Sequence, residues 1–399
     1  MSGVDSFDAS SSALGYIYQV RYALLLALQK INTVEDPDDC LVSIEKIDDI
    51  SFHSEGTPDQ LLQSKHHATQ GNLTDRSPDI WKTVRVWSEY LITKPKTEDV
   101  TFTLVTTETV TDGSLACWLS PEGSRRNVDS ALTRMQEISE EVSNVANRSS
   151  YKAFKALSPA QQRKLVGSIY VLGSAHTITD LAQELKKKLR TTVETKHIDP
   201  FLTRLEGVWF NKSIQLLAST DFAAISLGEL VSIIDDLRSQ FLPGNLPSDF
   251  EEEFPEVMDL EGDSRIFVEQ LRLINAPNSV IEFAIINYYR AYEQRSRWLR
   301  ENLVKPGEVG KYLARLTDEW NHHRSLQEMN IAGSEEMDSV QLGRKIYSSC
   351  QNEGARPIRR DFDAKYVARG TYHVLADSQE IGWRPDFEEQ LNADNMGVA

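Results

Sequence analysis

Three polar side chains between residues 44 and 67 have the types and spacing needed for metal-assisted cleavage of a phosphodiester bond. Asp49 follows a segment at 41–47 whose alternation predicts a strand, and it opens a second alternating segment. Gln63 and Lys65 fall on one face of a further strand, because strand side chains repeat every two residues. Two adjacent strands would therefore present Asp49, Gln63 and Lys65 to one pocket.

The chemistry follows from these three groups. The carboxylate of Asp49 and the amide oxygen of Gln63, or a backbone oxygen beside it, suit a hard cation such as Mg²⁺ or Mn²⁺. Such a cation would polarise the phosphate and help to ionise a water molecule, and Lys65 would activate that water or stabilise the developing charge. Asp48 and Glu45 are further candidates, because the sequence does not fix which acidic side chain faces the pocket.

A simpler interpretation explains the same residues. Pairs of aspartates are common at strand edges, and a Gln-x-Lys pattern on an exposed strand is usually just solvated, so short motifs of this kind produce false positives. The segments around the triplet therefore have to decide between a cation site and an ordinary polar strand face.

Neighbouring elements would position these side chains. A helix is predicted at 13–31, where apolar residues keep helical spacing and Gln19 faces away from most of them. Another helix is predicted at 79–92, with its two tryptophans on a stripe typical of a protein core. β-Branched residues alternate over 100–111 and predict a central strand. The sequence therefore predicts an α+β fold with a mixed sheet flanked by helices, followed by a mainly α-helical region.

The motifs in this first third of the chain resemble a known family. They are Gly15-Tyr16-Ile17-Tyr18-Gln19, Glu45-Lys46-Ile47-Asp48-Asp49, Gln63-Ser64-Lys65 and Trp81-Lys82-Thr83. Their order is similar to that in the PD-(D/E)xK endonuclease domain of bacterial antiphage effectors, and it looks most like the domain that opens CBASS-type DNA-degrading effectors.

The resemblance implies a restriction-endonuclease-like domain over residues 1–150 that cleaves double-stranded DNA through Asp49, Gln63 and Lys65. It also places Gln19 beside the active site as an accessory polar group, although an exposed helical glutamine would explain that residue equally well. Gln63 departs from the commoner Asp or Glu at its position. This Gln variant is familiar in the Mrr-like branch, and it lowers the charge available to a second metal ion.

Helical patterns dominate the chain from about residue 112. They recur at 128–147, 158–167, 177–190, 262–274, 278–302, 308–324 and 335–351. We expect residues 151–399 to form a helical docking and regulatory region.

Motifs in the C-terminal half resemble the shared C-terminal region of effectors in ABC-three-component systems, including the Lamassu antiphage family. The motifs are Leu205-Glu206-Gly207-Val208-Trp209, Asn287-Tyr288-Tyr289-Arg290-Ala291-Tyr292, Trp320, and the segment from Arg369-Gly370-Thr371-Tyr372 to Gly382-Trp383. This resemblance implies a subunit that docks an SMC-like ATPase and a small middle subunit. The chain has no Gly-x₄-Gly-Lys-Ser/Thr phosphate loop, so it is not itself the expected ATPase.

The net charge favours a protein partner over a uniformly DNA-binding surface. Sixty acidic residues against 43 basic ones give −17, whereas surfaces that bind DNA normally carry a basic excess. Lys186, Lys187 and Lys188 form a local basic cluster, which is either a solvated helix face or a contact to the phosphate backbone. We therefore expect one copy to bind DNA weakly, and a homo-oligomer to grip it through several copies.

Other features bear on the location of the chain. No run of about 18 apolar residues is present, and the chain does not open with a basic segment before an apolar stretch, so neither a membrane span nor a secretory signal is expected. Cys40, Cys117 and Cys350 form no CxxC pair and indicate neither a zinc site nor a disulfide framework. These features fit the reducing cytoplasm of a bacterium.

The working hypothesis is a metal-dependent DNA endonuclease effector of an antiphage or antiplasmid complex. An SMC-like ATPase partner would hold it inactive, and release followed by oligomerisation would activate it. Two alternatives remain open at this point: a catalytically inactive interaction subunit of the same complex, and an effector that cleaves RNA.

Overall fold

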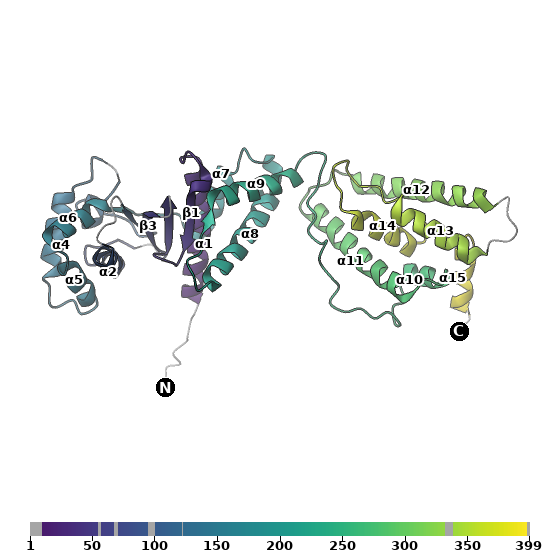
Figure 1. The fold of residues 1–399 in the computed structure, drawn as a ribbon, viewed down its shortest axis with the longest axis horizontal. Coiled ribbons are helices and arrows are strands. Elements are labelled where there is room, and N and C mark those ends of the chain that lie inside the picture. The colour runs from purple at the N-terminus through teal and green to yellow at the C-terminus, as the bar shows by residue number, and fades with distance from the viewer. Residues whose placement is uncertain are drawn as a thin grey trace, which may run out of the picture. The chain divides into compact units, whose positions relative to one another are not determined.

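The computed structural model describes residues 10–54, 57–67, 71–94, 100–121, 123–331 and 338–396 (Figure 1). The chain divides into two compact units. The first, here called the sheet unit, comprises Met1–Thr192 and Phe201–Asp236. The second, here called the helical unit, comprises Val193–Pro200 and Leu237–Ala399.

A six-stranded mixed sheet forms the centre of the sheet unit, with strand order β5-β4-β3-β2-β1-β6. Strands β1, β2 and β3 form an antiparallel meander, β6 pairs antiparallel with β1, and β3, β4 and β5 run parallel. The strands are β1 (Cys40–Ile44), β2 (Ile50–Ser54), β3 (Thr57–Lys65), β4 (Thr101–Thr106), β5 (Ile169–Leu172) and β6 (Ile225–Ser226).

Helices cover both faces of this sheet (Figure 1). Lys30 of α1 lies over the ring of Phe52 on one face, at 5.6 Å from its centroid. On the other face Leu61, Phe102 and Leu104 pack against α2. The helices of the sheet unit are α1 (Ser10–Ile31), α2 (Pro78–Thr93), α3 (Leu115–Trp118), α4 (Val128–Ser139), α5 (Arg148–Lys155), α6 (Pro159–Ser168), α7 (Ile178–Lys188), α8 (Ile198–Ala218, entering from the other unit) and α9 (Leu227–Gln240), with 3₁₀ turns η1 (Pro37–Asp39) and η2 (Thr195–His197, in the helical unit).

The sequence of α2 explains both its start and its packing. Ser77 caps the helix, because its hydroxyl accepts a hydrogen bond from the backbone N–H of Asp79, and Pro78 supplies a preset φ in the first turn. Trp81 and Trp87 lie fully buried against the sheet. This confirms that the tryptophan stripe belongs to the core.

The sheet unit extends beyond residue 150, the boundary expected for the nuclease-like domain. Helices α7 and α8 return to pack on α1, where Arg21 forms an ion pair with Glu206 at 2.6 Å. The indole N–H of Trp209 donates to the carbonyl of Val20 at 2.7 Å, and Tyr18 donates to the carbonyl of His176. The first helix is therefore buried by segments more than 150 residues away in sequence.

The helical unit is built around a close pair of helices, α11 and α14. Gly370 allows their approach, because a Cβ at this position would overlap the carbonyl of Asn287. Buried indoles tie loops to this core: Trp298 donates to the carbonyl of Pro247 at 2.8 Å. Its helices are α10 (Ile266–Leu273), α11 (Asn278–Arg300), α12 (Glu308–Ile331), α13 (Ser339–Asn352), α14 (Lys365–Asp377) and α15 (Phe387–Met396).

The expected fold class is confirmed, while several boundaries differ. The strand expected at 41–47 ends at Ile44, because Glu45 adopts a φ of +56° and begins a turn. The strand expected at 100–111 covers only Thr101–Thr106. The helix expected at 128–147 ends at Ser139, residues 140–147 form turns, and the next helix, α5, begins at Arg148.

The remaining expectations concern cysteines and membranes. All three cysteines are free and buried. Among the described residues, no helix is both long and apolar enough to cross a bilayer. Residues 335–337 of the helix expected at 335–351 lie outside the described part of the chain.

Candidate functional site

The structure brings Asp49, Gln63 and Lys65 together where β2 begins and β3 ends. Asp49 lies in the β1–β2 turn, and its Oδ1 accepts a hydrogen bond from Gln63 Nε2 at 2.8 Å. The Lys65 ammonium donates to Gln63 Oε1 at 2.8 Å and lies 3.8 Å from Asp49 Oδ2. The expected convergence of a carboxylate, an amide and an amine in one place is therefore present.

Ser64 fixes the Asp49 carboxylate from the neighbouring strand position. Its backbone N–H donates to Asp49 Oδ2 at 2.8 Å, and its hydroxyl lies 3.3 Å from the same oxygen. Strand alternation places the Ser64 side chain on the opposite face from Gln63, so the sequence pattern does not predict this contact. The contact uses the backbone N–H, which lies in the plane of the sheet.

Asp48 is the more enclosed of the two aspartates. It is 5% exposed, and Trp87 Nε1 of α2 donates to its Oδ2 at 2.7 Å. Gln63 Nε2 donates to its other oxygen, so the same amide group contacts both aspartates. Burial raises the pKa of Asp48 to about 7, although the hydrogen bonds from Gln63 and Trp87 oppose this shift. Asp48 is therefore a buried anchor for Gln63, and Asp49 is the carboxylate next to the lysine.

Glu45 and Gln19 complete the acidic end of this pocket. The turn brings Glu45 back toward Asp49, whose carbonyl accepts a hydrogen bond from the Glu45 backbone N–H at 3.1 Å. Burial and the charge of Asp49 raise the pKa of Glu45, while a hydrogen bond from the Gln19 side chain and the charge of Lys65 lower it. Gln19 thus lies beside the pocket, and its shielded Oε1 has no hydrogen-bond partner among the residues that the structure describes.

The donor groups of the pocket fit a hard divalent cation. Glu45, Asp48 and Asp49 carry carboxylates and Gln19 carries an amide oxygen, which are ligand types that Mg²⁺ and Mn²⁺ prefer. Gln63 turns its amide nitrogen toward both aspartates and its Oε1 toward Lys65. Bringing the buried carboxylates of Asp48 and Asp49 together with the exposed Glu45 at the β1–β2 turn is costly without a compensating positive charge. Lys65 supplies one such charge, and a divalent cation would supply two more.

The lysine cluster of the sequence lies on a different element. Lys186, Lys187 and Lys188 form the last turn of α7, a helix that packs on α1 and carries none of the pocket residues. Lys187 pairs with Glu184 at 2.6 Å on an exposed helix face. The structure does not bring this cluster into the pocket, and a phosphate contact by it stays a prediction.

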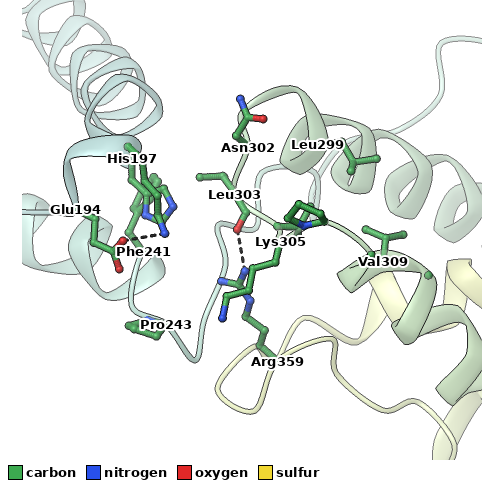
Figure 2. Close-up of a pocket in the computed structure, with 15 residues that line it drawn as sticks. Glu194, His197, Phe241, Pro243, Leu299, Asn302, Leu303, Lys305, Val309 and Arg359 are labelled. Carbon is green, nitrogen blue, oxygen red and sulfur yellow. Dashed lines mark hydrogen bonds and ion pairs between the residues drawn. The ribbon is translucent and has the colours of Figure 1, made fainter.

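The helical unit contains a separate hollow of about 690 Å³ (Figure 2). Figure 2 shows Lys305 and Arg359 projecting toward it from one side and His197 and Phe241 from the other. The Arg359 guanidinium is already held by Glu308 at 2.7 Å and by the carbonyl of Leu303 at 2.8 Å. This arginine therefore stabilises the unit from within.

The raised pKa of Asp48 predicts a specific dependence of stability on pH. Between its usual value of 3.8 and about 7, the folded protein retains a proton on Asp48 that the unfolded chain releases. Stability from this group is therefore present at low pH and lost as the pH rises toward 7. We expect Asp48→Asn to raise the melting temperature relative to the unsubstituted protein more at pH 8 than at pH 5.

The measurement is a pair of thermal melts at the two pH values. Asp112→Asn is the matched control, because the Asp112 side chain is 87% exposed and its substitution should not change the comparison. An equal effect of Asp48→Asn at both pH values would contradict a protonated, buried Asp48.

Comparison with known proteins identifies the C-terminal part of the chain. No curated protein matches the sequence. Residues 267–391, which lie within the helical unit, match the family described as C-terminal domain 7 of the ABC-three component (ABC-3C) systems. The C-terminal part of the chain is therefore similar to a domain of ABC-three component systems.

Proposed function

We propose that this chain is a metal-dependent DNA endonuclease, acting as the effector of a bacterial antiphage or antiplasmid defence complex of the Lamassu type. The observation that carries the proposal is the position of the Lys65 ammonium, 2.8 Å from Gln63 Oε1 and 3.8 Å from Asp49 Oδ2. The order of motifs around this site, which resembles the PD-(D/E)xK endonuclease domain, supports the same reaction. The ABC-3C domain supports the defence setting.

The residues of the site have distinct roles in this proposal. Asp49 would hold Mg²⁺ or Mn²⁺ through its carboxylate, and Gln63 would hold it through its amide oxygen once that oxygen leaves Lys65. The bound ion would polarise the scissile phosphate and make a water molecule more acidic. Lys65 directs its ammonium at the attacking oxygen or at the charge that develops on phosphate. Asp48 acts as a positioning residue, because its hydrogen bonds hold Gln63 against Trp87.

The remaining pocket groups adjust the charge around these three side chains. Glu45 lies close enough to Asp49 for the charge of Asp49 to raise the pKa of Glu45, and Gln19 hydrogen-bonds to Glu45. Ser64 fixes Asp49 through its backbone N–H, so that the carboxylate keeps its second oxygen beside Lys65. This preorganisation favours a reaction at one defined phosphate.

The proposed partners are an SMC-like ATPase and a small middle subunit, docked on the helical unit. Exposed aromatic and aliphatic side chains on α11 support this assignment, because large apolar groups in contact with water commonly mark binding surfaces. Phe283 is 67% exposed, and Tyr292 and Leu299 are also more than half exposed. All three lie within the segment that matches the ABC-3C family.

Control of the nuclease follows from its charge. With a net charge of −17, a single copy repels the DNA backbone at long range. Several copies on one duplex would act together through their high effective concentration. We propose that the ATPase partner holds one copy inactive and that release allows an active homo-oligomer to form.

Substitution of Lys65 tests the catalytic assignment. Lys65→Ala should abolish magnesium-dependent nicking of plasmid DNA, because it removes the positive charge next to Asp49. The protein should stay folded, with a melting temperature lowered by the loss of this one charge partner. The assay compares purified proteins at equal concentration with Mg²⁺ and with EDTA. Parallel reactions on RNA of the same sequence distinguish a DNA nuclease from an RNA nuclease.

Lys82→Ala provides the matched control, because Lys82 lies on the exposed side of α2 outside the pocket. Full plasmid cleavage by Lys65→Ala would reject the assignment of Lys65. Absence of cleavage in every protein and every assembly state would instead favour an inactive interaction subunit.

A pair of exposed phenylalanines, one in each unit, tests where the partners dock. Phe283→Ser in the helical unit should reduce co-purification of the ATPase subunit with the full chain, because it removes an exposed apolar contact. Phe210→Ser, at a 43% exposed position in the sheet unit, should leave co-purification intact. The opposite pattern would place the interface on the sheet unit.

Oligomerisation as the activating step has its own test. We expect size-separated oligomer to cleave plasmid faster than monomer at equal chain concentration and fixed salt, because several weak DNA contacts then act together. Cleavage by a species that remains monomeric on DNA, at the rate of the oligomer, would reject the clustering mechanism while leaving the nuclease assignment in place.

A further inference from the structure

A second group of ligands lies just beyond the end of β3. One nitrogen of His67 and one carboxylate oxygen each of Asp79 and Glu108 lie within 4.8 Å of one another. Among the described residues, this is the one group of three or more His, Cys, Asp or Glu side chains with such spacing. None of its members belongs to the Asp49 pocket.

The strand register explains how these residues meet. In the parallel pair of β3 and β4, Lys65 lies opposite Thr106. His67 and Glu108 each lie two residues past this pair, just beyond the ends of β3 and β4, and His67 contacts Asp79 on the sheet face that carries Lys65. That face is covered by α2, and Asp79 lies in the first turn of this helix.

The contacts within the group are incomplete without a cation. His67 Nε2 lies 2.6 Å from Asp79 Oδ2, which accounts for one nitrogen and one oxygen. Glu108 Oε2 is shielded from water and has no hydrogen-bond partner among the described residues. Two carboxylates that meet at this distance repel each other, and a shared positive ion would turn this repulsion into attraction.

The chemistry of the donors narrows the class of cation. Zn²⁺ is bound by imidazole nitrogen and carboxylate oxygen at about 2.0–2.2 Å, so its ligand atoms lie about 3.3 Å apart, which falls between the 2.6 Å contact and the 4.8 Å limit. An imidazole ligand favours first-row transition metals over Mg²⁺. The His67 side chain is 38% exposed, so an ion can enter from solvent.

We propose that His67, Asp79 and Glu108 form a binding site for a divalent transition metal ion such as Zn²⁺, separate from the Asp49 pocket. The ion joins the end of β3, the exit of β4 and the start of α2. It thereby fixes the strand end that carries Lys65. This inference does not depend on the proposed nuclease activity, because it concerns binding and stability alone.

The experiment titrates Zn²⁺ into the metal-free full-length protein, with a chromophoric chelator as competitor, and records thermal melts with and without the ion. We expect one tight site per chain and a melting temperature that rises with Zn²⁺. His67→Gln and Glu108→Gln should each weaken binding about tenfold or more and remove the rise, by analogy with the losses seen when metal-site partners are removed.

Two controls separate this site from its neighbours. His66→Gln should bind Zn²⁺ normally, because the His66 ring packs against Tyr18 instead, at 4.8 Å between ring centroids and tilted by 37°. Asp49→Asn should also bind it normally, even if it loses nuclease activity. Equal Zn²⁺ affinity in the unsubstituted protein, His67→Gln and Glu108→Gln, or loss of the tight site in Asp49→Asn, would overturn the proposal.

Glu108→Gln distinguishes a metal site from a pair of side chains, His67 and Asp79, that only stabilises the fold. If His67 and Asp79 were only a stabilising pair, His67→Gln would lower the melting temperature in EDTA, and Zn²⁺ would stabilise neither the unsubstituted protein nor Glu108→Gln. That pattern would also overturn the proposal.

Discussion

The burial of two adjacent carboxylates at the β1–β2 turn is the constraint on which the candidate site depends. Asp48 and Asp49 are only 5% and 7% exposed, and buried acidic groups are costly unless they are hydrogen-bonded or paired with a cation. One amide, that of Gln63, donates to both of them. Because Trp87 donates to Asp48 from α2, the same cluster also locks the helix to the sheet. The site and the hydrophobic core are therefore built from shared contacts.

The register of β3 determines which of its side chains face this cluster. Gln63, Lys65 and His67 follow one another at every second position and face α2, whereas Ser64 and His66 face the opposite way. A slip of one residue would turn the lysine away from Asp49 and place Leu62 where a polar group is needed. The apolar stripe of α2 opposes such a slip, because it packs on Leu61 of the same strand.

Side-chain alternation every two residues in strands, and apolar repeats every 3.6 residues in helices, were sufficient to predict the fold class and the convergence of Asp49, Gln63 and Lys65. They could not predict features set by turns or by distant segments. The positive φ of Glu45 depends on the turn as a whole, and it decides that Asp48 is turned toward Trp87. The ion pair between Arg21 and Glu206 joins residues that are 185 positions apart in sequence. No local sequence pattern could therefore predict that α7 and α8 belong to the sheet unit. The His67 group needs three segments at once and was missed for the same reason.

Charge links the pocket to the overall composition of the chain. Glu45, Asp48 and Asp49 concentrate acidic groups at the place where a phosphate would have to approach, in a chain that already carries −17. Lys65 offsets only one of these groups. A divalent cation bound by Asp49 would therefore do more than polarise a phosphate: it would neutralise the local negative charge that opposes DNA. By thermodynamic linkage, DNA would in turn strengthen the binding of the cation, so that metal and substrate would each be held weakly alone and tightly together.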